Sequence, residues 1–408
     1  MDGEKGAISS YTRWICSSIK SACKKHGGRP GGSAGAKGAT RDMLSIARGF
    51  ADEAELHPFT MHPKAFIGSF GLGAFFDIIG VNFFILFLIY PYPVLSFLSF
   101  LMFFLSILVV LLEFFLYLPF TDKFYPAAKS ENLFLVRKAK ETSQRKIIFV
   151  GHSDSAYELP FVSKRPRALF VTVIIGAEIS KITGLILGIL FTFSPLAESL
   201  YPTLIITECV MLIFLVPFLF FVNWDAVTDG ANDNLTGCYL ALSVMKEMSD
   251  RGERLNNTDL CCLITDGEES GLRGAMAFAK KNRDRLRAEN ALVIAVDTVH
   301  DPSEIMIYDR GINFTQKNGK RATELLKRAG EALGIKIPTS PFYPGATDAE
   351  AFSRAGVEAA AICAVSHGVC DYYHTKSDNA DNLSECGIEI TRRVLLNAAK
   401  IYDAEEII

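Results

Sequence analysis

The sequence lacks an excess of charge of either sign. Its 42 Lys and Arg residues nearly balance 45 Asp and Glu residues, which leaves a formal net charge of −3. The basic residues are spread along the chain and form no concentrated patch. Proteins that bind nucleic acid need such a patch to neutralise phosphates. Nucleic acid is therefore not expected as a partner.

The sequence also lacks the paired cysteines that hold a zinc knuckle or form a redox couple. Nine cysteines are present, and none of them forms a C-x-x-C motif. Free, buried thiols in a reducing compartment are the expected state of these residues.

Long hydrophobic runs, by contrast, are abundant, and half of the chain is hydrophobic. Residues 65–120 are almost continuously apolar, which is enough for two spans of about 20 residues each. Tyr90, Pro91, Tyr92 and Pro93 interrupt this run as a turn. A second pair of spans covers 168–193 and 202–222, separated by a polar turn. The sequence thus predicts four transmembrane helices in two hairpins, 65–120 and 168–223, and lipid as a partner.

Basic residues flank both hairpins, whereas neither turn contains Lys or Arg. Because positive charge near spans stays on the cytoplasmic side, both termini and the long C-terminal part are expected there, in a multi-pass integral membrane protein. Charged residues inside the spans are costly in lipid, so they should face helix neighbours or water. These residues are Asp77, Glu113, Glu178 and Lys181. Glu178 and Lys181 lie one helical turn apart and can pair.

The remaining segments predict one soluble domain and an N-terminal extension. Residues 1–40 are basic and rich in glycine, which predicts a flexible tail, although residues 8–25 could form a weak amphipathic helix on the membrane. Residues 41–64 are expected as a helix that packs on this soluble domain or on the membrane. Residues 121–167 and 224–408 are expected to form the soluble domain, which the second hairpin divides.

Strands and helices alternate in this domain, which predicts an α/β fold with a mixed, mostly parallel sheet flanked by helices. The expected strands are 132–137, 146–150, 260–265, 291–296 and 359–365, and the expected helices are 237–248, 271–281, 321–333 and 388–404. Ligands of such sheets collect at the carboxyl ends of the strands.

Polar residues of the types that bind zinc follow these strands or lie in polar loops. They are His152, Asp154, Asp233, Glu268, Glu269, Asp297 and His374. Imidazole and carboxylate suit a catalytic zinc site, and one carboxylate can bridge two ions. Asp154 can orient the imidazole two residues before it. Of the adjacent Glu268 and Glu269, one can bind metal while the other acts as a base.

Several strings of the sequence resemble the M28 family of zinc peptidases. They are Val150-Gly151-His152-Ser153-Asp154-Ser155, Asp229-Gly230-Ala231-Asn232-Asp233-Asn234, Asp266-Gly267-Glu268-Glu269-Ser270-Gly271, Val296-Asp297 and Tyr373-His374-Thr375 with Asp378. The resemblance covers 121–408 without the hairpin insert. Two features depart from the family pattern: Thr347-Asp348-Ala349 stands where Ser-Asp-His is frequent, and a membrane hairpin replaces a short loop.

The resemblance implies a zinc aminopeptidase-like fold, two Zn²⁺ ions and a peptide substrate. His152 and Asp297 would bind one ion, Glu269 and His374 the other, and Asp233 both; other divalent metals suit the same ligands. Asp154 would orient His152.

By this resemblance the ions lower the pKa of a bridging water, and Glu268, as general base, takes its proton during attack on an N-terminal peptide bond. Three alternatives stay open: acyl transfer as in glutaminyl cyclases, a catalytically inactive membrane binding module, and a transporter.

Overall fold

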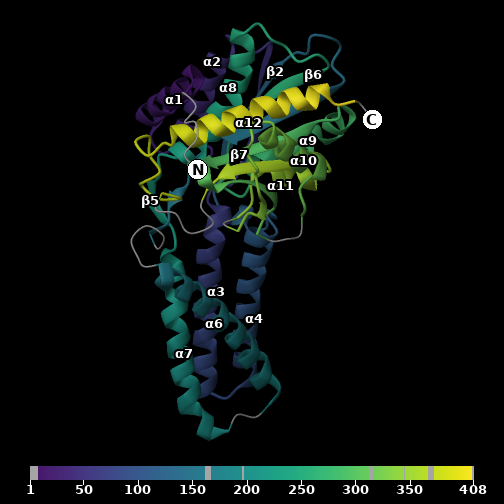
Figure 1. The fold of residues 1–408 in the computed structure, drawn as a ribbon. Helices are drawn as coiled ribbons and strands as arrows, with labels where there is room; N and C mark the ends of the chain where they lie inside the picture. The colour runs from purple at the N-terminus through teal and green to yellow at the C-terminus, as the bar shows by residue number, and fades with distance from the viewer. Residues whose placement is uncertain are drawn as a thin grey trace. The chain divides into compact units, whose positions relative to one another are not determined.

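The computed structural model describes residues 8–160, 167–194, 197–312, 316–343, 345–365 and 372–406. The chain divides into two compact units (Figure 1). The α/β unit consists of Met1–Pro63, Ala127–Tyr157 and Val227–Ile408, and the helical unit consists of Lys64–Pro126 and Glu158–Ala226. Both units are therefore assembled from separate stretches of the chain.

The α/β unit is built on an eight-stranded sheet in the order β1-β2-β6-β3-β7-β10-β8-β9. Its strands are β1 Glu53–Met61, β2 Ala128–Arg137, β3 Arg145–His152, β6 Thr258–Thr265, β7 Leu292–Val299, β8 Ile305–Arg310, β9 Thr339–Pro341 and β10 Glu358–Ala364. Neighbouring strands β6, β3, β7 and β10 are parallel, whereas β1, β2 and β8 run antiparallel to a neighbour. The predicted mixed, mostly parallel sheet is confirmed.

Burial explains which segments became strands. Every residue of β6 and β7 is buried, as expected for strands covered on both faces. β1, in contrast, alternates between exposed and half-buried residues and contains Pro58. Proline lacks the N–H that a central strand needs, so β1 is suited to the edge of the sheet, where it lies.

Helices cover both faces of this sheet (Figure 1). A hydrophobic core on one face joins the strands to α1 Ser10–His26, α2 Ala34–Ala47, α8 Thr236–Asp250, α10 Lys320–Glu331 and α12 Glu385–Ala404. On the other face, α9 Arg273–Ala288 packs against β1 and β2, and α11 Asp348–Arg354 packs against β10.

The N-terminal segment differs from the prediction of a flexible tail at 1–40 and a helix within 41–64. Residues 10–26 and 34–47 are the helices α1 and α2, whose first turns are capped by Ser9 and Ser33, and residues 53–61 are strand β1. The apolar face of α1, with Ile15 and Ile19 fully buried, packs into the core of the α/β unit. The amphipathic helix weighed for residues 8–25 therefore forms, and its apolar face packs on this core.

The helical unit contains four helices that are long and apolar enough to cross a membrane, as predicted. Their apolar stretches are Ala65–Ile89, Pro93–Phe115, Val171–Phe193 and Tyr201–Phe220. They correspond to α3 Ala65–Ile89, α4 Pro93–Val110 with the turn Leu111–Phe115, α6 Arg167–Phe193, and α7 Tyr201–Leu215 with the turn Val216–Phe220.

Polar side chains inside these helices are buried or paired. Nζ of Lys181 lies 2.7 Å from a carboxylate oxygen of Glu178, so the predicted ion pair forms. Asp77 is fully buried, and Glu113 accepts hydrogen bonds from Thr121. Glu208 of α7 is a further buried acid that the sequence reasoning missed. Burial of this kind would lower the cost of such groups in a membrane.

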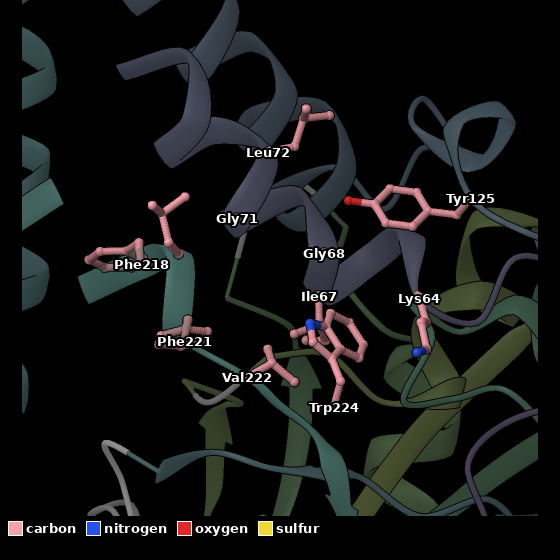
Figure 2. A pocket seen from close by; sticks show the side chains of 11 residues that line it. Lys64, Ile67, Gly68, Gly71, Leu72, Tyr125, Phe218, Phe221, Val222 and Trp224 are labelled. Atoms are coloured by element: carbon pink, nitrogen blue, oxygen red, sulfur yellow. The ribbon is translucent and has the colours of Figure 1, made fainter. Parts of the chain in front are cut away.

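A pocket of about 320 Å³ opens in the helical unit between the start of α3 and the end of α7 (Figure 2). Its walls are mostly apolar, and the Lys64 ammonium lies over the Trp224 ring, 5.0 Å from its centre. Trp and Lys at the ends of apolar helices are typical of the level of lipid headgroups.

Candidate metal centre

The sheet topology gathers the candidate ligands at one edge. Strands β6, β3 and β7 are parallel neighbours, so their carboxyl ends meet at the same edge. His152 is the last residue of β3, and Glu268 and Glu269 follow the end of β6. The register pairs Val150 with Ala295, which brings His152 level with Asp297 on the neighbouring strand.

Three groups of side chains lie close enough together to hold a metal ion, with their ligand atoms within 4.8 Å of one another. The groups are His152 with Asp233 and Asp297, His152 with Glu268 and Glu269, and Asp233 with Glu269 and His374. All six residues were predicted as metal ligands or as the base, so the structure brings every one of them together.

Asp233 belongs to two of these groups. Its Oδ1 lies 3.2 Å from Nε2 of His152, and its Oδ2 lies 3.3 Å from Nε2 of His374. One carboxylate thus faces two imidazoles that belong to different groups. Such an arrangement is what a carboxylate bridging two cations requires.

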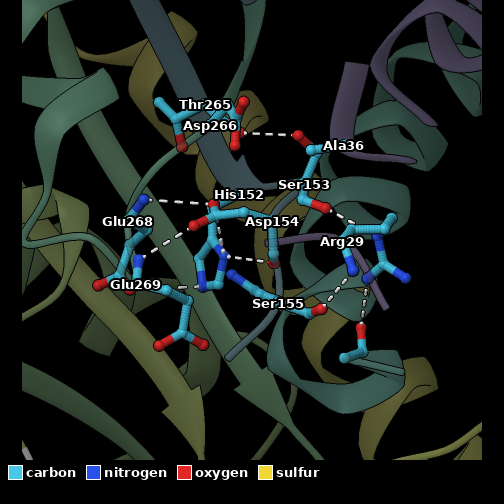
Figure 3. A network of polar contacts seen from close by, with 12 residues as sticks. Arg29, Ala36, His152, Ser153, Asp154, Ser155, Thr265, Asp266, Glu268 and Glu269 are labelled. Carbon is cyan, nitrogen blue, oxygen red and sulfur yellow. Dashed lines mark hydrogen bonds and ion pairs between the residues drawn. The ribbon is translucent and has the colours of Figure 1, made fainter. Parts of the chain in front are cut away.

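Asp154, the seventh predicted residue, lies behind His152 instead of among the ligand atoms. Its Oδ1 is 3.4 Å from Nδ1 of His152, and its backbone carbonyl is 3.1 Å from the same nitrogen. The Asp154 carboxylate also accepts hydrogen bonds from the backbone N–H groups of Glu268 and Glu269, at 3.2 and 3.1 Å (Figure 3). Asp154 therefore fixes the imidazole and the loop of the two glutamates together.

Glu268 and Glu269 differ in their surroundings. The nearest Glu269 oxygen is 3.3 Å from Nε2 of His374, whereas the nearest Glu268 oxygen is 3.8 Å from Nε2 of His152. Successive residues point in different directions, so the two carboxylates serve different sides of the cluster.

The charges of the cluster shift its pKa values in opposite directions. Burial alone would lower the pKa of His152, but neighbouring carboxylates, Asp154 and Asp233 among them, hold it well above the usual value. Burial raises the pKa of Glu268 well above its ordinary range, and nearby carboxylates add to the effect. Burial also opposes ionisation of Asp233, yet His152 and His374 lower the pKa of its carboxyl. A buried excess of carboxylates of this kind favours cations.

Supporting residues around the cluster were only partly visible in the sequence. Asp378, part of the matched Tyr373-His374-Thr375 region, accepts hydrogen bonds from the backbone N–H groups of Asn232, at 2.6 Å, and Asp233, at 3.2 Å. It therefore orients the loop that carries Asp233. The Tyr373 ring stacks on the His374 ring, with centres 4.0 Å apart.

Asp348, in the string that departs from the family pattern, is buried and accepts a hydrogen bond from the Thr265 hydroxyl at 2.5 Å. Burial raises the pKa of Asp348 to about 7. The departure at Thr347-Asp348-Ala349 leaves the ligand groups complete.

The cluster fits a zinc ion by the chemistry of its donors. Among the described residues, neither Nε2 of His152 nor Oε1 of Glu269 has a hydrogen-bond partner, although both atoms are buried. Buried polar atoms are normally satisfied, and imidazole and carboxylate are ligands that zinc prefers. A cation would satisfy both atoms.

The structure thus combines an α/β sheet with an imidazole–carboxylate cluster at the carboxyl edge of its parallel strands. Residues 218–399 match the model described as peptidase family M28. No curated protein matches the chain.

Solved structures of aminopeptidases and of a glutaminyl cyclase share the fold. An aminopeptidase from Aneurinibacillus sp. strain AM-1 is similar with a TM-score of 0.56 and 14% identity, over 97% of this chain and 96% of that chain. A glutaminyl cyclase from Fimbriiglobus ruber is similar with a TM-score of 0.57 and 12% identity, over 98% and 97%. A zinc aminopeptidase from Bacillus subtilis is similar with a TM-score of 0.55 and 12% identity, over 98% and 96%.

Proposed function

We propose that this protein is a membrane-anchored peptidase with two zinc ions, which removes amino acids from the N-terminus of peptides. The observation that carries the proposal is the position of Asp233, whose two oxygens face His152 and His374 in separate ligand groups. Asp297 completes the first group and Glu269 the second. The similarity to zinc aminopeptidases supports the same assignment.

The remaining residues have roles in positioning and proton transfer. When bound, zinc ions would lower the pKa of a water molecule and polarise a peptide carbonyl. Glu268, at the edge of the ligand atoms, takes the proton from the attacking water and passes it to the departing amine. Asp154 holds the His152 ring in its orientation through contacts with Nδ1.

A second candidate function is cyclisation of an N-terminal glutamine. It is supported by the similarity to glutaminyl cyclases, which is as strong as the similarity to aminopeptidases. A catalytically inactive binding module is disfavoured because all candidate ligands and Glu268 are present and gathered.

Membrane anchoring and orientation belong to the same proposal. The four apolar helices support an integral membrane protein, and the basic residues that flank the hairpins support a cytoplasmic α/β unit and cytoplasmic termini. Lipid and peptides are then the partners.

One experiment tests the activity. The full-length protein, purified in detergent, is analysed for bound metal and assayed with aminoacyl substrates and with peptides that begin with glutamine. Release of amino acids by a preparation that contains about two zinc ions per chain is expected. Cyclisation without release would favour the second candidate, and a protein that binds no divalent metal would refute both.

A further inference from the structure

The connector between α1 and α2 contains a buried arginine whose partners are backbone atoms of two site loops. The Arg29 side chain has no exposed surface. Its Nε donates to the Ser153 carbonyl at 2.8 Å, Nη1 to the Asp229 carbonyl at 2.7 Å, and Nη2 to the Gly230 carbonyl at 3.0 Å (Figure 3). Nη1 also reaches the Gly27 carbonyl at 2.8 Å.

The carbonyls of Ser153, Asp229 and Gly230 belong to the two loops that present the central ligands. Ser153 stands between His152 and Asp154, and Gly230 lies three residues before Asp233. The planar guanidinium fork thus holds the loop after β3 at a fixed distance from the loop before α8. Burying a charge is costly unless it is fully hydrogen-bonded. The four carbonyl partners of the Arg29 guanidinium therefore explain why this charge can be buried.

The main chain of Arg29 also links the connector to the loop after β3 and, through Ser155, to the loop before α8. The Arg29 N–H donates to the Ser155 hydroxyl at 2.9 Å, and the Ser155 N–H donates to the Arg29 carbonyl at 2.9 Å. The Ser155 hydroxyl in turn donates to the Thr228 carbonyl at 2.8 Å. Both loops are therefore linked to Arg29 twice.

A third loop, which carries Glu268 and Glu269, also touches the connector. The Gly32 N–H donates to the Asp266 carboxylate at 2.9 Å. A Cβ atom on Gly31 would lie 3.0 Å from Oγ of Ser270, and one on Gly28 would lie 2.6 Å from Cβ of Val227. The glycines that suggested a flexible tail are thus required for close packing.

We propose that Arg29 is a positioning residue for the metal centre. It acts through the loops of His152 and Asp233, so that their ligand atoms keep the spacing that the metal ions need. Arg29 lies outside residues 218–399, which match the family model. The proposal rests on the proposed function in one respect, that the cluster binds divalent metal.

The test compares Arg29→Lys and Arg29→Gln with a matched control, Arg145→Lys. Arg145 is also buried and donates to backbone carbonyls, those of Asp403 at 2.9 Å and Glu405 at 2.7 Å. It begins β3, whereas His152 ends it, so about seven residue steps of ~3.3 Å separate the control from the site.

Three measurements are made on the full-length proteins in detergent. Zn²⁺ affinity is measured by competition with a chromogenic chelator, the visible absorption of bound Co²⁺ reports ligand geometry, and thermal unfolding after EDTA treatment reports the stability of the fold. Loss of residues behind metal ligands typically lowers affinity about 10- to 100-fold.

We expect Arg29→Lys to lose affinity in this range and to change the Co²⁺ spectrum, because an ammonium cannot reach both loops as a fork does. The EDTA-treated variant should unfold no earlier than Arg145→Lys, which should bind Zn²⁺ normally. Unchanged affinity and spectrum in both Arg29 variants, or an equal loss in Arg145→Lys, would overturn the proposal.

If the Arg29 variants do not fold, Ser155→Ala tests the positioning role instead. This variant removes only the hydroxyl that links the Arg29 N–H to the Thr228 carbonyl. A lower Zn²⁺ affinity is then expected, and an unchanged one would refute the positioning role. A wild-type protein that binds no metal would instead contradict the proposed function.

Discussion

Exchange of the two adjacent glutamates for glutamine separates the base from the ligand. Glu268→Gln keeps the size of the side chain but removes its ability to take a proton. The nearest Glu268 oxygen is 3.8 Å from Nε2 of His152, and the group His152–Asp233–Asp297 is complete without it. We therefore expect a loss of roughly 10²- to 10⁴-fold in kcat with metal retained, about 3 to 5 kcal/mol of transition-state stabilisation.

Glu269→Gln should behave differently because Glu269 is one of three residues in the group with Asp233 and His374. Its loss leaves that group with two protein ligands, so part of the zinc should be lost together with activity. Metal content by mass spectrometry and hydrolysis rates are measured on the same samples, with Glu331→Gln on the exposed side of α10 as control. Equal loss of metal in both variants would refute the assigned roles.

Three further predictions concern other parts of the α/β unit. Asp378→Asn should weaken Zn²⁺ binding about 10-fold. The two carboxylate oxygens of Asp378 accept from the N–H groups of Asn232 and Asp233, whereas an amide offers only one oxygen. Unchanged affinity in a chelator titration would contradict this. Hydrogen bonds from Arg254 lower the pKa of Asp52 from 3.8 to about 2, so this contact stabilises the fold above pH 4 and loses its effect as the pH falls toward 2. Asp52→Asn should therefore cost about 1 kcal/mol at pH 7, after allowance for partial exposure, and only a small fraction of that at pH 2, as thermal unfolding in low salt can check. A single cysteine at Lys320, in a cysteine-free background, should resist an impermeant thiol reagent in intact cells, and modification there would reverse the proposed orientation.

The sheet and the site could be predicted from the sequence because both depend on recognisable patterns of side-chain types. Buried strands such as β6 and β7 are continuous apolar runs, and the ligands follow them as polar residues at the carboxyl ends. The edge strand β1 has no such run, and it contains Pro58, a residue found in strands mainly at sheet edges.

The packing of the N-terminal helices on the core could not be predicted, for a physical reason. The apolar face of α1 is narrow, and the glycines of the connector give no sign of close packing in a sequence. Arg29 binds backbone carbonyls, which every residue possesses, so none of its partners could be identified from residue types.

The interrupted course of the α/β unit imposes an order on its biogenesis. Strand β1 is synthesised before the first apolar hairpin, β2 and β3 between the two hairpins, and β6 to β10 only after the second. β2 pairs with β6, and β3 lies between β6 and β7, so the centre of the sheet cannot close until both hairpins have left the ribosome. His152 is synthesised before the second hairpin and Asp233 after it, so these two ligands can come together only when that hairpin is complete. The sheet and its ligand cluster can therefore be completed only after both hairpins have been synthesised, and in the proposed membrane-anchored protein this order would let the hairpins enter lipid before metal is bound.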